Sequence, residues 1–256
     1  YPLFDFIESS KDIIIEASSF MLEYIRNFHS KYIVLLNIHK THLDHHLTFT
    51  NYIKSKINIL KNVTEDDYII YNDDDTIIKR IVNLYPGIKI PFSMHNMNGV
   101  YCDEVYIYYQ GKPVFLKKNI KLLGNHNVMN IMAAIAVVLN YRGNLERISS
   151  FYGVKYRLEF IGNFNGIDIY NDSKSTNFLA TSEALRALKS KKVLLICGGM
   201  RRNDEYSLLE DVENVQKIYL YGENRFDFLK HFNSLRKECF LYSHLEEVIA
   251  NLSLEV

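Results

Sequence analysis

The sequence predicts an α/β fold with a mostly parallel sheet, divided into two domains. Short apolar runs of strand length alternate with amphipathic segments of helical period along most of the chain. At 256 residues the chain is long enough for two domains. The pattern changes after Pro86 and again near Gly153. We place the domain boundary at the second change, which gives domains of residues 1–153 and 154–256.

The first domain is expected to begin with alternating strands and helices. A buried strand is predicted at Asp12–Ile15, and Ser18 or Ser19 is suited to cap a helix after it. The next elements are predicted as strand Tyr32–Leu36, amphipathic helix Phe49–Leu60 and strand Tyr68–Tyr71. Strands that alternate with helices favour a mostly parallel, doubly wound sheet.

A small antiparallel element is expected in the middle of the chain. Val105–Tyr109 and Pro113–Lys117 flank Gln110-Gly111-Lys112, which is the pattern of a β-hairpin. An alanine-containing helix at Asn127–Tyr141 and a shorter one at Leu145–Tyr152 follow.

The second domain is expected to open with a hairpin around Asn165-Gly166, because that dipeptide separates two apolar runs, Glu159–Ile161 and Ile167–Tyr170. The α/β alternation then resumes. Its predicted strands are Val193–Cys197, Lys217–Tyr221 and Cys239–Tyr242, and its predicted helices are Asn177–Lys189, Leu208–Val215 and Phe226–Leu235. This order is similar to a Rossmann-like domain, although the G-x-G-x-x-G fingerprint is absent from the sequence.

Composition narrows the classes of partner. Thirty basic and thirty acidic residues cancel, so no global field draws the chain to nucleic acid or to an anionic membrane. The longest apolar stretch, Ile131–Leu139, is too short to span a bilayer. The three cysteines are widely spaced and fit a reducing cytosol, so a cytoplasmic location is expected. Because the chain starts with Tyr1, we interpret it as a piece of a longer protein.

One group of polar residues suggests metal chemistry. Glu16 follows an apolar run, and ligands collect at the carboxyl ends of strands, but a solvated carboxylate is the simpler interpretation. His42-x-Asp44 suits a metal or a phosphate, or else belongs to a hydrated, His-rich loop. Lys56 lies on the flank of its helix's apolar stripe. A shielded lysine reacts as the free amine and can take up CO₂ as a carbamate, whereas a snorkelling lysine remains charged.

A second group of polar residues suggests nucleotide binding. Gly124-Asn125-His126-Asn127 precedes a helix that either uses an Asn as its cap or directs Asn130 at a ligand. In Asn171–Asn177, Asp172 is suited to a ribose hydroxyl and Lys174 to a phosphate, while Ser175 or Thr176 caps the next helix. Gly198-Gly199 permits close backbone approach, and Arg201-Arg202 is either a carboxylate clamp or a surface turn.

Taken in order, these segments resemble the Mur ligase family. The matching segments are Glu16-Ala17-Ser18-Ser19-Phe20, Asn37-Ile38…His42-Leu43-Asp44, Lys56, Gly124-Asn125-His126-Asn127…Asn130, Arg157-Leu158-Glu159, Asp172-Ser173-Lys174…Thr176-Asn177 and Gly198-Gly199. Each is modest alone, but their order and spacing are specific and cover nearly the whole chain. The resemblance implies a central ATPase-type domain followed by an incomplete Rossmann-like C-terminal domain.

The resemblance also implies an activity. Members are ATP- and Mg²⁺-dependent amide-bond ligases of peptidoglycan synthesis that activate a carboxylate as an acyl phosphate. The E-x-S-S-F form indicates the member that adds D-glutamate to UDP-N-acetylmuramoyl-L-alanine, here expected as a monomer. By this resemblance, Glu16, His42 and a carbamylated Lys56 are expected to bind Mg²⁺, and Ser18 to contact the muramoyl substrate. ATP is expected to contact Asn130, Arg157 and Asp172. Substrate phosphate or D-glutamate is expected to contact Lys174, Thr176 and Arg202. His42, Lys56 and Lys174 are the residues expected to be catalytic.

The sequence departs from the family pattern in four places. The phosphate-binding loop G-x-x-G-K-[ST] is expected before Tyr1, and a Ser- and Phe-containing segment that helps to hold D-glutamate is expected after Val256. Thr41 and Met200-Arg201 stand where acidic residues are usual. The 256 residues alone are therefore expected to be inactive and to bind ATP very weakly. Another superfamily ligase, such as a folylpolyglutamate synthase, and a non-catalytic nucleotide-binding domain remain the alternatives.

Overall fold

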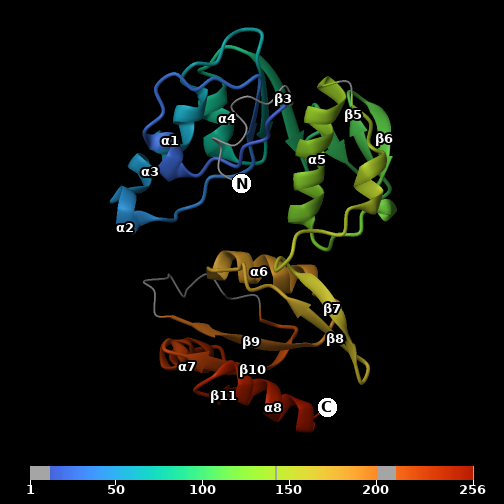
Figure 1. Cartoon of the computed structure of the whole chain (residues 1–256). Coiled ribbons are helices and arrows are strands. Elements are labelled where there is room, and N and C mark those ends of the chain that lie inside the picture. Colours follow the sequence, from blue (N-terminus) through green and yellow to red (C-terminus); the bar gives the residue numbers. More distant parts are fainter. Residues whose placement is uncertain (1–11, 142, 201–211, 256) are drawn as a thin grey trace. The chain divides into compact units, whose positions relative to one another are not determined.

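A computed structural model describes residues 12–141, 143–200 and 212–255 (Figure 1). Contacts divide the chain into two compact units. Unit 1 comprises residues 1–117 and 132–144, and unit 2 comprises residues 118–131 and 145–256. Helix α5 (Asn125–Asn140) therefore contributes residues to both units. The domain boundary at residue 153 stays a prediction, because division by contacts does not define family domains.

Unit 1 is built on a six-stranded sheet in the order β1-β2-β3-β4-β5-β6. The strands are β1 (Tyr32–Leu35), β2 (Tyr68–Asn72), β3 (Ile88–Ser93), β4 (Val100–Cys102), β5 (Tyr106–Tyr109) and β6 (Lys112–Leu116). Neighbours from β1 to β4 are parallel, and those from β4 to β6 are antiparallel. This confirms the mostly parallel α/β sheet, and the predicted antiparallel hairpin forms one edge of it. The order of the described strands shows no reversal, so double winding is not seen there.

Alternation along β1 assigns the two faces of this sheet. Ile33 and Leu35 are buried in a core that includes residues of α3 (Phe49–Ile57) and α4 (Thr76–Val82). Tyr32 points to the opposite face, because successive side chains of a strand alternate, and its hydroxyl donates to the carbonyl oxygen of Asn140 in α5 at 3.1 Å. The short helices of this unit are α1 (Ser19–Glu23), α2 (Leu43–His46) and the 3₁₀ turn Asn58–Leu60. A further 3₁₀ turn, Lys117–Asn119, contributes residues to both units.

The strand predicted at Asp12–Ile15 is wrong. These residues belong to neither helix nor strand, and the Ile14 side chain is 99% exposed. A strand needs a hydrogen-bonded neighbour as well as an apolar run, and a four-residue run gives no information about a neighbour.

Unit 2 has a three-stranded parallel sheet, in the order β11-β10-β9, and a two-stranded antiparallel one. Its strands are β7 (Glu159–Phe164), β8 (Ile167–Asn171), β9 (Val193–Gly199), β10 (Val215–Gly222) and β11 (Cys239–Leu241). Its further helices are the 3₁₀ turn Glu146–Ser150, α6 (Phe178–Ala187), α7 (Arg225–Ser234) and α8 (Leu245–Glu255). Half of the predicted helix, residues 208–211, lies outside the described residues. The other half is wrong, because residues 212–214 are not helical and Val215 begins β10.

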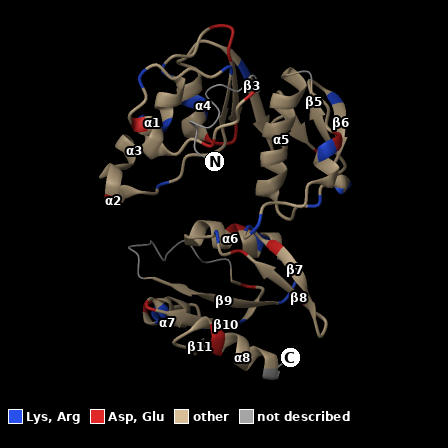
Figure 2. Ribbon diagram, viewed as in Figure 1, with Lys and Arg blue, Asp and Glu red and all other residues tan. Residues whose placement is uncertain are grey.

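Alternation along β10 separates the faces of the parallel sheet. Ile218 and Leu220 share a core with Phe178 of α6 and with Phe228 of α7. Tyr219 points to the other face, which α8 covers. Basic and acidic residues are spread over both units (Figure 2). Among the described residues, no helix is long and apolar enough to cross a membrane.

Candidate functional site

The first cluster of predicted site residues lies in unit 1, around the start of α1. Ser18 caps this helix, because its hydroxyl oxygen accepts the backbone N–H of Met21 at 3.3 Å. The Ser18 proton remains available to a ligand, since a hydroxyl accepts and donates at the same time. Glu16 lies two residues before this cap and is exposed.

His42 reaches the same cluster from a different segment. It is the N-cap residue of α2 and holds the left-handed conformation, with φ 54° and ψ 36°. Few residues other than glycine adopt this backbone region, and such outliers gather at functional sites. The His42 ring lies edge-on to the Phe20 ring of α1, with 5.1 Å between centroids. The structure therefore brings the E-x-S-S-F segment beside His42.

Lys56 completes this cluster from α3, which packs against α1. Burial lowers the pKa of the Lys56 amine, and the negative charge of Glu16 partly opposes this effect by raising it. The charge of Glu16 is therefore close enough to act on Lys56. A lysine with a lowered pKa has a larger fraction of free amine, which is the form that adds CO₂. Lys56 is thus partly buried, which agrees with the shielded alternative that the sequence left open, and burial lowers the pKa of its amine.

The second cluster lies in unit 2, where two segments run side by side. Asp172 accepts the backbone N–H of Leu158 at 2.8 Å and the hydroxyl of Ser175 at 2.5 Å. The backbone N–H of Lys174 donates to the carbonyl oxygen of Tyr156 at 3.1 Å. These bonds fix the segment that carries Arg157 against the segment that carries Asp172 and Lys174.

The backbone around Arg157 is unusual. Tyr156 and Leu158, on either side of it, both have positive φ, of 69° and 43°. Bulky residues avoid this region, so each costs on the order of 1–3 kcal/mol and persists only where its surroundings impose it. Here the two hydrogen bonds across the segments supply that constraint, and the Arg157 side chain is exposed between the two outliers.

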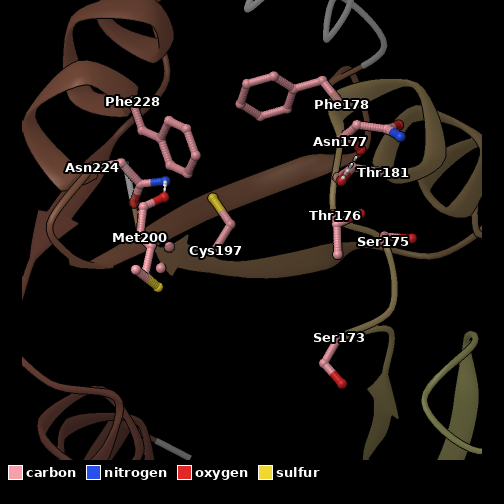
Figure 3. A pocket seen from close by; sticks show the side chains of 12 residues that line it. Ser173, Ser175, Thr176, Asn177, Phe178, Thr181, Cys197, Met200, Asn224 and Phe228 are labelled. Carbon is pink, nitrogen blue, oxygen red and sulfur yellow. Dashed lines mark hydrogen bonds between the residues drawn. The ribbon is translucent and has the colours of Figure 1, made fainter. Parts of the chain in front are cut away.

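A pocket of about 200 Å³ lies at the carboxyl end of β9 (Figure 3). Thr176 is the predicted residue that lines it. Asn177 caps α6 beside it, accepting the backbone N–H of Ala180 at 2.9 Å. The strand ends approach closely here, because a Cβ on Gly198 would lie 2.1 Å from the carbonyl oxygen of Tyr221. Gly198 thus permits close strand packing, whereas a Cβ on Gly199 would meet nothing within 4 Å. Both glycines line the pocket, so close approach to a ligand there stays a prediction.

Two predicted residues stand apart from these contacts. Asn130 is exposed on α5, and among the described residues no hydrogen bond joins it to Arg157 or Asp172. Arg202 lies outside the described residues. The start of α5 is nevertheless near the second cluster, because the charges of Glu183 and Asp172 act on His126, whose pKa burial lowers.

Three residues near this site were given no functional role in the analysis of the sequence, although His126 belongs to the Gly124–Asn127 motif named there. Asn224 is 5% exposed and donates to the carbonyl oxygen of Met200 at 3.3 Å, while its Oδ1 has no partner among the described residues. His126 Nδ1 is also buried, has no hydrogen-bond partner in the part of the chain that the structure describes, and lies 4.0 Å from Glu183. Burial raises the pKa of the Cys197 thiol to about 12, so this pocket residue remains an uncharged thiol. Asn224 lies two residues after β10, and its place near the carboxyl end of a strand is the signal in the sequence that could have drawn attention to it.

The fold and the two clusters define the class of protein. A model of the Mur ligase middle domain matches residues 3–138, more than half of the chain. The chain therefore belongs to the Mur ligase family. The solved MurF ligase of Thermotoga maritima in complex with ADP has the same fold, with a TM-score of 0.68 at 18% identity over 89% of this chain and 56% of that one. The E. coli FolC complex with DHPP and ADP has a TM-score of 0.65 at 11% identity, covering 89% of this chain and 56% of that one.

Curated relatives are closer in sequence. The UDP-N-acetylmuramoylalanine–D-glutamate ligase of Oceanobacillus iheyensis is 38% identical over 224 residues, which is 85% of this chain and 50% of the relative. The enzyme of the same name from Streptococcus mutans is 37% identical over 84% of this chain and 49% of its own length. The chain thus spans about half the length of the curated relatives it matches.

Proposed function

We propose that this chain is part of an ATP-dependent amide-bond ligase that adds D-glutamate to UDP-N-acetylmuramoyl-L-alanine in peptidoglycan synthesis. The observation that carries the proposal is the environment of Lys56, a partly buried amine on which the charge of Glu16 acts. His42 contacts Phe20 of the segment that begins with Glu16. A solvated surface lysine would have neither the burial nor the acidic neighbour. The names of the relatives supply the substrates.

The first cluster fits a Mg²⁺ ion. Mg²⁺ prefers oxygen ligands, which Glu16 supplies and which Lys56 would supply as a carbamate, with His42 as a further ligand. A bound Mg²⁺ would neutralise phosphate charge during transfer. Ser18 keeps a hydroxyl proton for the muramoyl substrate, because its oxygen is already engaged as the helix cap.

The second cluster fits a nucleotide and an anionic substrate. Asp172 is held by Leu158 and Ser175 and keeps lone pairs for a ribose hydroxyl. Arg157 and Lys174 are exposed cations on the segments beside it, suited to phosphate. We assign Asn130 to the nucleotide as well, and Thr176 and Arg202 to D-glutamate or phosphate.

The proposed reaction has two steps. Phosphoryl transfer from ATP to the acceptor carboxylate gives an acyl phosphate, with Lys174 offsetting the charge that moves. The amine of D-glutamate then attacks the acyl carbon and inorganic phosphate leaves, so an amide bond forms as the acyl–phosphate bond breaks. We further propose a cytoplasmic, monomeric enzyme whose central ATPase domain ends near residue 153 and is followed by a Rossmann-like domain.

Turnover by the native-length protein tests this proposal. We expect phosphate release that requires both UDP-N-acetylmuramoyl-L-alanine and D-glutamate, and loss of that release in Lys56→Ala and Lys174→Ala. Lys118→Ala, an exposed lysine outside both clusters, is the matched control. Release that requires a folyl acceptor would instead establish the related ligase. Binding of nucleotide without turnover of either acceptor would contradict catalysis altogether.

A further inference from the structure

A second group of potential metal ligands lies in unit 1, formed by residues that the proposed function does not use. Glu23, the last residue of α1, and His45 and His46, the last two of α2, bring three ligand atoms within 4.8 Å of one another. His45 Nε2 donates to Glu23 Oε2 at 2.8 Å. The three residues line a hollow of about 280 Å³ that Asn51 and Ser55 help to form.

The hydrogen bonds of His46 place its proton on Nδ1 and leave Nε2 unprotonated, which is the state that a metal ligand needs. Ser55 donates its hydroxyl proton to the carbonyl oxygen of Asn51 at 3.1 Å, so it accepts from His46 Nδ1, 3.4 Å away. The lone pair then lies on His46 Nε2, which accepts from the Ser19 hydroxyl at 3.0 Å. His46 is 4% exposed, and the serine behind Nδ1 fixes its tautomer in the way that partners of ligating histidines do.

Two imidazoles and a carboxylate form a donor set for Zn²⁺. Zn²⁺ binds His nitrogen and carboxylate oxygen at about 2.0–2.2 Å, and His₂Glu with a water molecule as fourth ligand is an established set. Glu23 and His45 are exposed and can turn toward His46, which closes the spacing. Lys54, on the same hollow, is exposed, and water and salt screen its charge.

We propose that Glu23, His45 and His46 form a Zn²⁺ site, separate from the proposed Mg²⁺ cluster. His45 would bind through Nε2 with its proton moved to Nδ1, and the metal would displace the Ser19 hydroxyl from His46. This site joins α1 to α2, whose N-cap is His42. Zn²⁺ therefore stabilises the loop that carries His42, and the proposal does not depend on the identity of the ligase.

Zn²⁺ titration of the untagged chain by calorimetry tests the site, with thermal unfolding followed in parallel. We expect one Zn²⁺ per chain and a higher Tm when Zn²⁺ is bound. Glu23→Gln and His45→Gln should each weaken binding by at least about 100-fold, because each removes a ligand and the loss of a ligand's hydrogen-bond partner alone costs about 10–100-fold. His39→Gln, an exposed histidine on the same loop, and His42→Gln should bind Zn²⁺ as the unaltered chain does.

Co²⁺ absorption gives an independent readout, because intense d–d bands indicate a four-coordinate site and are expected to vanish in Glu23→Gln. Absence of Zn²⁺ binding to the unaltered chain would overturn the proposal. Unchanged affinity in both Glu23→Gln and His45→Gln would do so as well. Loss of binding in His42→Gln alone would place the ion in the proposed Mg²⁺ cluster and would also refute it.

Discussion

Asp67→Asn gives a prediction whose size follows from the structure. Asp67 is 1% exposed and stands immediately before β2. Its Oδ2 accepts the backbone N–H and the hydroxyl of Thr64, each at 2.8 Å, and His29 Nε2 at 2.7 Å. Lys31 lies 3.6 Å from Oδ1. Burial alone would raise the pKa of Asp67, but these bonds outweigh it and lower the pKa from 3.8 to about 2.

This difference in pKa between the unfolded and folded chain corresponds to about 2.4 kcal/mol, at about 1.36 kcal/mol per pKa unit. Because the folded pKa is the lower one, the contribution is complete above pH 3.8 and is lost as the pH falls through about 2. Asp67→Asn removes the charge and turns one acceptor into a donor. We therefore expect a loss of about 2 kcal/mol at neutral pH and a smaller loss at pH 2.5.

Urea denaturation at pH 7 and pH 2.5, followed by circular dichroism, measures both values. Asp66→Asn is the matched control, because Asp66 is adjacent and exposed, and a surface substitution of this kind changes stability by less than about 0.5 kcal/mol. If Asp67→Asn is as stable as Asp66→Asn at pH 7, or if its deficit grows on acidification, the reasoning from hydrogen bonds to pKa is refuted.

Three further substitutions test the first cluster, the strand contact at Gly198 and the second cluster. In the absence of Mg²⁺ and bicarbonate, Lys56→Met should raise the Tm, because it removes a partly buried charge. This gain in Tm should shrink as the pH rises toward 10.5, where the lysine is neutral in the unfolded chain as well. Lys54→Met, at an exposed position, is the control and should leave the Tm unchanged. Gly198→Ala should cost about 1–3 kcal/mol in urea denaturation, since its Cβ would meet the facing strand at 2.1 Å, whereas Gly162→Ala, with nothing within 4 Å, should cost less than about 1 kcal/mol. Asp172→Ala should lower turnover of the native-length protein at least 10-fold. It should also increase proteolytic cleavage near residue 158, because the hydrogen bonds of Asp172 to Leu158 and Ser175 are lost. Cleavage at the same rate as in the unaltered protein would contradict those bonds.

The hairpin of unit 2 was predictable from the sequence, whereas β3 was not. Asn165-Gly166 joins β7 to β8 with φ of 47° and 87°, which is the conformation that this dipeptide favours. Pro91 lies inside β3, where a proline argues against a central strand. The fold accommodates it because β4 pairs with β3 only from Phe92 onward, so Pro91 faces no partner on that side.

The candidate site likewise contains residues that the sequence indicated and residues that it did not. The grouping of Glu16, His42 and Lys56 came from the resemblance to the family. In the structure the charge of Glu16 acts on Lys56 and Phe20 contacts His42, while the shared metal-binding role stays a prediction. Asn224 was not predicted, since its burial beside Met200 depends on the pairing of β9 with β10. Pairing between strands is a long-range property that local pattern does not specify.

Isotope transfer tests the central claim most directly. UDP-N-acetylmuramoyl-L-alanine labelled with ¹⁸O in its terminal carboxylate would be turned over with ATP and D-glutamate by the native-length protein. If the carboxylate is activated as an acyl phosphate, one labelled oxygen leaves with each phosphate, and mass spectrometry will detect it. Amide product accompanied by unlabelled phosphate would contradict the account.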